Sequence, residues 1–266
     1  MSILLLCLFC VSLSAALPLP GTEEKQNAWE LSGRFEGDIL LSPDDEKAMR
    51  NGLIAKKHHW PNGVVPYVIS PVFTKEQADF INATLEEYNK RTCITIRPAV
   101  STDVNLVNVT GNTDGCYSHV GLKGGVQTLN LSPNKPNSGC FRKGTILHEF
   151  LHALGFYHMQ SAPDRDNYVT VVWGNILTGH EHNFKKYGTD TVTEYGVEYD
   201  YNSVMHYSAY AFSKNGNKTI VPLDANAEIG QRVDFSQRDI EKLEIMYGCR
   251  KYDFMIFNLS AYAFVK

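Results

Sequence analysis

The chain has 266 residues, a formal net charge of −4 and an isoelectric point near 6.1. It therefore lacks the basic surplus that neutralises phosphates, which argues against nucleic acid as a main partner. With 43% hydrophobic and 11% aromatic residues, the chain is too apolar to be disordered, and it is long enough for one large domain or two small ones.

The first 16 residues have the pattern of a secretory signal peptide. A short apolar run is followed by Ser14, Ala15 and Ala16, which form a cleavage site of the A-x-A kind. The apolar run is short for a membrane span. It lacks the basic residue that usually precedes the apolar run of a signal peptide. We expect residues 1–16 to be removed, so that the mature protein is secreted and extracellular without a membrane span. An uncleaved anchor is the alternative.

Residues 17–50 are acidic and weakly patterned, as in a pro-segment or a linker. Apolar, strand-like patterning begins after Arg50, so we expect processing between Arg50 and Asn51 by an activating protease, for which a trypsin-like enzyme fits. Residues 51–250 then form the main domain, and residues 251–266 form a short apolar tail of unclear role.

The main domain predicts an α+β fold. Residues 74–92 read as a helix that opens with a capping box of Thr74 and Gln77, and residues 236–248 read as a second helix with Ser236 and Asp239 in the same roles. Short strands are expected at 93–100, 105–110, 116–121 and 126–132. Residues 161–235 are rich in turns. This order predicts two lobes: a twisted mixed sheet with helices, then a loop-rich half.

Four cysteines remain after the signal peptide: Cys93, Cys116, Cys140 and Cys249. An even number in an oxidising compartment predicts two disulfides, with three pairings open. A cysteine zinc site is the alternative, but no C-x-x-C pair supports it. Five glycosylation sequons also fit a secretory route, at Asn82, Asn108, Asn130, Asn217 and Asn258.

The segment HEFLHALGFYH gathers three of the nine histidines into eleven positions. On a helix, His148 and His152 are four residues apart and share one face, so both can bind one metal ion. Glu149 lies beside that metal without having to ligate it, as a general base for a water molecule requires. Short H-E-x-x-H patterns also occur by chance, so the prediction of a metal site depends on the longer pattern that includes Gly155 and His158.

Gly155 can take the left-handed conformation that ends a helix, which lets the chain turn and bring His158 back as a third ligand. Three imidazoles leave positions open for water and substrate, as at catalytic zinc. H-E-x-x-H-x-x-G-x-x-H is the metzincin signature, and SVMHY supplies the Met-turn of that class, with Met205 as the floor beneath the ligands. One zinc ion per chain is expected.

From about Arg34 to Cys249 the chain resembles the astacin family of zinc endopeptidases. The resemblance implies that Tyr207 is an extra zinc ligand, which moves off to hydrogen-bond the oxyanion of the tetrahedral intermediate. It also implies that FEGDI is the motif of a latent pro-segment, in which Asp38 reaches the zinc and displaces the catalytic water. Without the downstream motifs, FEGDI would read as an acidic turn.

The resemblance further implies the pairings Cys93–Cys249 and Cys116–Cys140. It implies that residues 126–132 form an edge strand to which an extended polypeptide substrate adds as a further strand. A glycan on Asn130 would then obstruct the cleft. The size of the chain is similar to that of compact members such as hatching enzymes, and a monomer is expected.

Two positions depart from the family pattern. Met159 stands where the family usually has a glutamate that helps to fix the new amino terminus, and Ala162 stands where it often has arginine. The leading hypothesis is a secreted zinc metalloendopeptidase that cuts extracellular or egg-envelope proteins and is made as a zymogen. The alternative, supported by these two positions alone, is a secreted zinc-binding protein that has lost catalysis and acts by binding.

Overall fold

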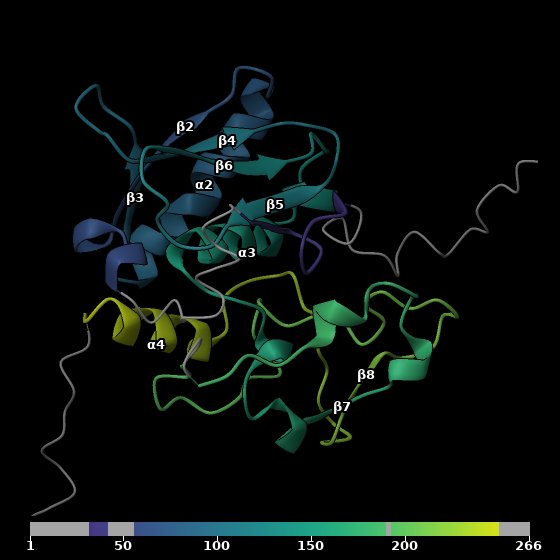
Figure 1. The fold of residues 1–266 in the computed structure, drawn as a ribbon. Coiled ribbons are helices and arrows are strands. Elements are labelled where there is room, and N and C mark those ends of the chain that lie inside the picture. Colours follow the sequence, from purple (N-terminus) through teal and green to yellow (C-terminus); the bar gives the residue numbers. More distant parts are fainter. Residues whose placement is uncertain (1–31, 42–55, 190–192, 250–266) are drawn as a thin grey trace, which may run out of the picture.

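The computed structural model describes residues 32–41, 56–189 and 193–249 (Figure 1). Several predicted features lie outside this part of the chain: the signal peptide at 1–16, most of the predicted pro-segment, the cleavage site between Arg50 and Asn51, and the tail at 251–266 with its sequon at Asn258. Among the described residues, no helix combines the length and the apolar composition needed to cross a membrane.

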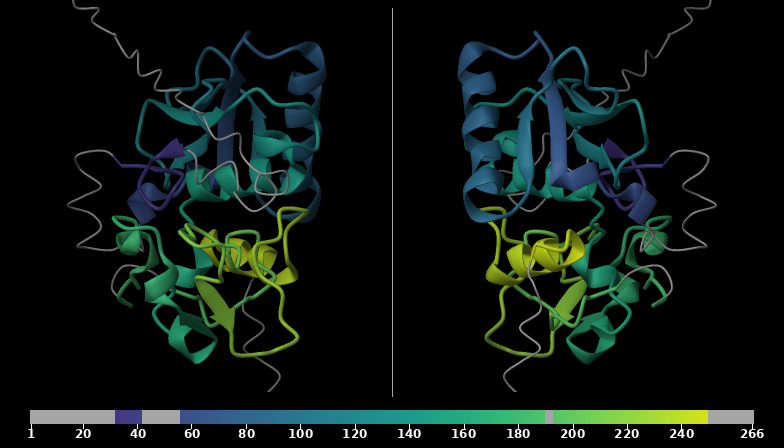
Figure 2. Two further views of the ribbon diagram at one scale, coloured as in Figure 1. Left: turned by 90° about the vertical axis from the view of Figure 1, so that its right-hand side faces the viewer. Right: turned by 90° about the vertical axis from the view of Figure 1, so that its left-hand side faces the viewer.

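The molecule has two lobes, which are separated most clearly in the side views of Figure 2. The upper lobe in Figure 1 holds a six-stranded sheet with helices α2 (Lys75–Arg91) and α3 (Lys143–Leu154). The lower lobe holds α4 (Gln237–Met246), a two-stranded sheet and several short 3-10 helices. The predicted α+β architecture, with a mixed sheet and a loop-rich second half, is confirmed.

Helices α2 and α4 begin where the sequence predicts. Each opens with a capping box, in which the side chains of the first and fourth residues bond each other's backbone amides: Thr74 with Gln77, and Ser236 with Asp239. These bonds satisfy amide groups that the first turn of a helix otherwise leaves without partners. Asp239 also accepts hydrogen bonds from the side chain of Ser203 and the amide of Val204, so α4 is tied to the Met-turn.

The large sheet has the order β1-β5-β6-β4-β2-β3. Its strands are β1 (Ile39–Leu40), β2 (Val64–Ile69), β3 (Thr95–Pro98), β4 (Leu106–Thr110), β5 (Cys116–His119) and β6 (Val126–Leu131). All neighbours pair in parallel except β5 and β6, which are antiparallel. The four strands predicted between residues 93 and 132 are therefore present.

The prediction that residues 126–132 form the edge of the sheet is wrong. Strand β6 lies between β4 and β5, and β5 lies nearer the rim. The outer edge of β5 is covered by β1, which comes from the predicted pro-segment and pairs Ile39 with Ser118 and Leu40 with His119. The edge next to the histidine helix is thus occupied by the chain's own amino-terminal segment.

The lower lobe contains β7 (Val169–Val171) and β8 (Ile220–Pro222), which pair antiparallel and which the sequence pattern did not predict. The 3-10 helices of the described residues are η2 (Lys56–His58), η3 (Pro61–Gly63), η4 (Gly139–Phe141), η5 (Met159–Ser161), η6 (Arg165–Asn167), η7 (Trp173–Asn175) and η8 (Glu181–Phe184). Helix η5 begins directly after His158, the third histidine of the cluster.

Helix α3 is the buried centre of the molecule and lies between the sheet and the lower lobe (Figure 1). Every residue from Gly144 to Leu154 is buried, because apolar side chains occupy the faces that the histidines leave free. The helix ends at Gly155, which has a left-handed φ of 114°. A β-carbon there would lie 2.6 Å from Met246 Cε, the end of a flexible side chain that can move, so the backbone conformation is what favours glycine.

Two disulfides join distant parts of the fold. Cys93 pairs with Cys249 across a Cα–Cα distance of 6.0 Å, and Cys116 pairs with Cys140 across 5.6 Å. The first ties the end of α2 to the segment after α4, and the second ties β5 to η4. Asn130 is fully buried and its side-chain amide donates to the carbonyl of Gly115, so a glycan on it is incompatible with this fold.

Candidate metal centre

Helix α3 and the turn after it bring three histidines together, as their spacing predicts. His148 and His152 lie on one face of α3 with ring centroids 4.6 Å apart. After Gly155 the chain reverses, and the ring of His158 lies 4.8 Å from that of His152 and 5.2 Å from that of His148. All three side chains are buried.

The fourth member of the cluster is Asp38, from the segment just before β1. Its carboxylate lies 3.0 Å from His148 Nε2, 3.3 Å from His152 Nε2 and 3.2 Å from His158 Nε2. One donor atom from each of the four residues lies within 4.8 Å of the others. Asp38 is fully buried although it lies 110 residues before His148, so the fold delivers this carboxylate to the histidines.

The hydrogen bonds of the three rings define which nitrogen faces the centre. Each Nδ1 lies within hydrogen-bond distance of an oxygen that can only accept: His148 at 2.8 Å from the carbonyl of Val204, His152 at 2.7 Å from that of Phe156, and His158 at 2.8 Å from a carboxylate oxygen of Glu36. With a metal bound, each Nδ1 would therefore carry the proton, and each Nε2 would present a lone pair to the centre. Ligating histidines in metal sites have this arrangement.

These residues fit a zinc ion. Three imidazole nitrogens and one carboxylate oxygen are a donor set that zinc accepts in tetrahedral geometry. Two buried atoms at the centre, His152 Nε2 and Asp38 Oδ1, have no hydrogen-bond partner among the described residues. Buried polar atoms without partners are costly, and a shared cation would satisfy both.

Glu149 is fully buried on α3 beside these ligands, and neither of its carboxylate oxygens has a hydrogen-bond partner within the described parts of the chain. Burial raises the pKa of Glu149 well above its ordinary value, and the negative charge of Asp38 raises it further. A carboxyl group whose pKa is raised in this way can accept and release a proton near neutral pH.

The charges of the cluster depend on one another. Burial alone would raise the pKa of Asp38, but the positive charges of His158 and His152 outweigh it and hold the pKa well below its ordinary value. Burial would lower the pKa of His158, but the Asp38 carboxylate raises it to about 9. A metal dication would reverse the direction for His158, because a ligating nitrogen carries no proton.

The Met-turn lies directly against this cluster. Met205 is buried, and its carbonyl accepts a hydrogen bond of 3.0 Å from the amide of Met159, next to the third histidine. The ring of Tyr207 lies 4.7 Å from that of His158. Its hydroxyl donates to the backbone carbonyl of Glu36 across 2.6 Å, so the predicted oxyanion donor is held by the amino-terminal segment.

Comparison with known proteins places this geometry in a family. The model of the peptidase family Astacin matches residues 52–248. The chain belongs to the astacin family. Zinc metalloproteinase nas-15 of Caenorhabditis elegans is 41% identical over 232 residues, which cover 81% of this chain and 40% of nas-15. Meprin A subunit beta of Homo sapiens is 42% identical over 218 residues, which cover 81% of this chain and 30% of meprin.

A solved structure of the family agrees with the fold. High choriolytic enzyme 1, a hatching enzyme zinc-protease from Oryzias latipes, matches with a TM-score of 0.67 at 36% identity, covering 74% of this chain and 97% of that one. The chain therefore spans nearly all of that solved structure, but less than half the length of nas-15 or meprin.

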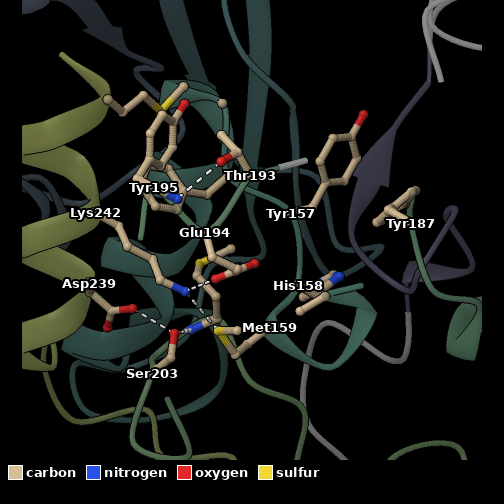
Figure 3. A pocket seen from close by; sticks show the side chains of 15 residues that line it. Tyr157, His158, Met159, Tyr187, Thr193, Glu194, Tyr195, Ser203, Asp239 and Lys242 are labelled. Carbon is tan, nitrogen blue, oxygen red and sulfur yellow. Dashed lines mark hydrogen bonds and ion pairs between the residues drawn. The ribbon is translucent and has the colours of Figure 1, made fainter. Parts of the chain in front are cut away.

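The two departures from the astacin pattern lie at a pocket beside His158, shown in Figure 3. The pocket encloses about 70 Å³ of space open to water-sized molecules. Lys242 reaches into it from α4, forms an ion pair with Glu194 and lies 3.4 Å from the sulfur of Met159. Ala162, also in the lining, is buried and adds no charge. The ammonium group of Lys242 thus lies next to Met159, the position at which the family usually has a glutamate.

Sequence reasoning missed four residues around the cluster. Glu36 lies within the FEGDI motif, whose aspartate alone drew attention. Gln160 follows His158 by two positions and accepts a hydrogen bond from the amide of Tyr207. Asn183 and Tyr187, which both bond Glu36, lie in a stretch without periodicity, so no local signal identified them.

Proposed function

We propose that this chain is the zymogen of a secreted zinc metalloendopeptidase, which hydrolyses peptide bonds of extracellular proteins. Glu149 carries the proposal: a buried carboxylate without a partner in the described structure lies beside four converging metal donors. A protein that only binds zinc would have no use for such a carboxylate. Egg-envelope proteins are one substrate class to test, because a solved relative is a hatching enzyme.

The positions of the residues support a catalytic role for each of them. His148, His152 and His158 would hold the zinc ion, which would supply Lewis acidity to the scissile carbonyl and to the attacking water. Glu149 would accept the proton of the attacking water and pass it to the leaving amine. Tyr207, once released by Glu36, donates its hydroxyl to the oxyanion.

The substrate would bind along β5. Strand β1 now uses this edge, where the amide of Ser118 donates to the carbonyl of Asp38 across 2.8 Å. Departure of β1 would expose the unpaired groups of β5, to which an extended polypeptide can add as a new strand. The predicted site of strand addition is thereby moved from residues 126–132 to residues 116–119.

The same segment explains latency. Asp38 occupies the centre of the donor cluster and β1 occupies the substrate edge, so the segment before Arg50 blocks both water and substrate. Cutting between Arg50 and Asn51 would separate it from the catalytic domain, since no cysteine lies in residues 17–50. The predicted signal peptide at residues 1–16 and the disulfides support secretion.

The proposal is tested by peptide hydrolysis with three proteins: the intact chain, the chain beginning at Asn51, and the latter with Glu149→Ala. Zinc is quantified in each. We expect hydrolysis by the trimmed wild type alone, with one zinc per chain in all three. If zinc is bound but no form cuts casein or a quenched peptide library, the zinc-binding protein without catalysis becomes the better description.

A further inference from the structure

The three metal-facing histidines differ in where their Nδ1 acceptor comes from. His148 and His152 donate to backbone carbonyls of the catalytic domain, whereas His158 donates to the side chain of Glu36 in the amino-terminal segment. The activating cut would therefore take this acceptor away from His158 and leave those of the other two rings in place. The three ligands would not be affected equally by maturation.

Glu36 is built into the site and is not a chance surface contact. It is 1% exposed, and its carboxylate also accepts a hydrogen bond of 2.5 Å from the Tyr187 hydroxyl. Its amide donates to Asn183 Oδ1, and its carbonyl accepts from Tyr207. Its backbone has a left-handed φ of 47°. A residue other than glycine keeps such a conformation only where its surroundings enforce it, and strain of this kind is concentrated at functional sites.

We propose that Glu36 is a positioning residue for the metal, which orients His158 and strengthens its ligation for as long as the pro-segment is bound. The inference rests on the proposed function, namely that the site binds zinc and that the pro-segment is released. A carboxylate on the far nitrogen of a ligating histidine fixes the ring and its tautomer and increases the basicity of the ligating nitrogen. Asp38 then provides latency, while Glu36 provides metal retention in the zymogen.

A competing explanation is that Glu36 merely docks the pro-segment. Arg34 separates the two explanations, because it docks the same segment and none of its described contacts is with a histidine. Its guanidinium forms an ion pair of 2.8 Å with Asp114 and lies 4.6 Å from the centre of the Tyr117 ring. If docking were the whole effect, loss of Arg34 and loss of Glu36 would release metal alike.

The test measures how fast zinc leaves the full-length, zinc-loaded chain in excess chromogenic chelator. Glu36→Ala should release zinc about 10–100-fold faster than the wild type, the usual effect of removing an outer partner of a ligand. Glu36→Gln should fall between the wild type and Glu36→Ala, because its amide oxygen still orients the ring of His158 but carries no negative charge. Arg34→Ala should stay within about twofold, because the outer partners of the ligands are intact. None of the variants should gain hydrolysis, because Asp38 remains in place.

The proposal is overturned if Glu36→Ala releases zinc at the wild-type rate, or if Arg34→Ala accelerates release as much as Glu36→Ala does. Should Glu36→Ala fail to fold, Tyr187→Phe removes one hydrogen bond to the same carboxylate and is expected to accelerate release several-fold; an unchanged rate also overturns the proposal. Zinc release needs no hydrolysis, so an inactive trimmed enzyme leaves the result unaffected. A wild-type chain that binds no zinc would instead overturn the proposed function itself.

Discussion

The backbone amide of Tyr207 donates a hydrogen bond of 3.1 Å to the side-chain oxygen of Gln160. This bond joins the Met-turn to the segment just after His158, and both partners are buried. This bond holds the backbone of Tyr207 in place. We therefore expect Gln160 to position the proposed oxyanion donor when Glu36 leaves in the proposed activation.

Replacing Gln160 with leucine should lower kcat of the trimmed enzyme about tenfold or more, with zinc still bound, because small misplacements of a catalytic group are costly. Steady-state kinetics with a quenched peptide and zinc quantification would check this. Gln231→Leu is the matched control, because the described hydrogen bonds of the Gln231 side chain all go to backbone groups of Asn202, Val233 and Asp234. Equal losses in the two variants would point to general destabilisation.

Tyr207→Phe in the trimmed enzyme should lower kcat about 10²–10³-fold and change KM little, the usual cost of removing one oxyanion donor. Zinc content should be unchanged, because three histidines remain. Tyr201→Phe removes a hydroxyl that bonds the carbonyl of Tyr168 elsewhere in the same lobe, and it should retain most activity. A Tyr207→Phe enzyme with wild-type kcat would remove this residue from the mechanism.

Asp38→Asn in the intact chain should produce measurable hydrolysis without any cut, because a neutral amide is a far weaker metal ligand than a carboxylate. We expect activity at least about tenfold above that of the intact wild type, on the scale of lost ligand partners. Activity should remain below that of the trimmed enzyme, since β1 would still cover β5. After trimming, the variant and the wild type are the same protein and must behave identically. If intact Asp38→Asn shows no hydrolysis, strand β1 rather than Asp38 would be the cause of latency.

Asp103 provides a pH-dependent test away from the metal. Two hydrogen bonds from the Arg97 guanidinium and one from the amide of Val100 lower the pKa of Asp103 to about 2. Because the folded pKa lies below the unfolded value of about 3.9, the ionised group stabilises the fold above that pH, and this stabilisation is lost as the pH falls toward 2.

The difference in unfolding free energy between wild type and Asp103→Asn should therefore be largest near pH 6 and shrink as the pH falls below about 4. Urea denaturation at pH 6, 4.5 and 3 measures it. The comparison between the two proteins removes the titration of the other carboxylates. A difference that stays constant over this range would show that the pKa of Asp103 is not lowered by folding.

Local patterns predicted the catalytic helix well. His148 and His152 are one helical turn apart, Gly155 can end a helix, and the capping pairs at Thr74 and Ser236 require only neighbouring residues. Each of these features is encoded within about a dozen positions, where helical periodicity and backbone preference act. The same holds for the short strands, whose alternation is local.

Features that depend on distant pairing were missed or misplaced. Strand β1 has two residues and pairs with β5 across 79 positions. Two residues are too few to show the alternating pattern by which a strand is predicted. The position of β6 within the sheet depends on which strands pair, and strand propensity carries no information about that. Glu36 acquires its role only when folding brings it to His158, 122 positions away.

The disulfide between Cys93 and Cys249 closes a loop with a sequence separation of 156, and the second disulfide lies inside that loop. A single backbone nick between the first pair of cysteines would leave both fragments covalently attached to each other. The pro-segment lies outside the loop, so the cut after Arg50 would let a peptide diffuse away. In the proposed zymogen, a nick in the lower lobe would thus leave the fragments linked, whereas the proposed cut after Arg50 would be irreversible.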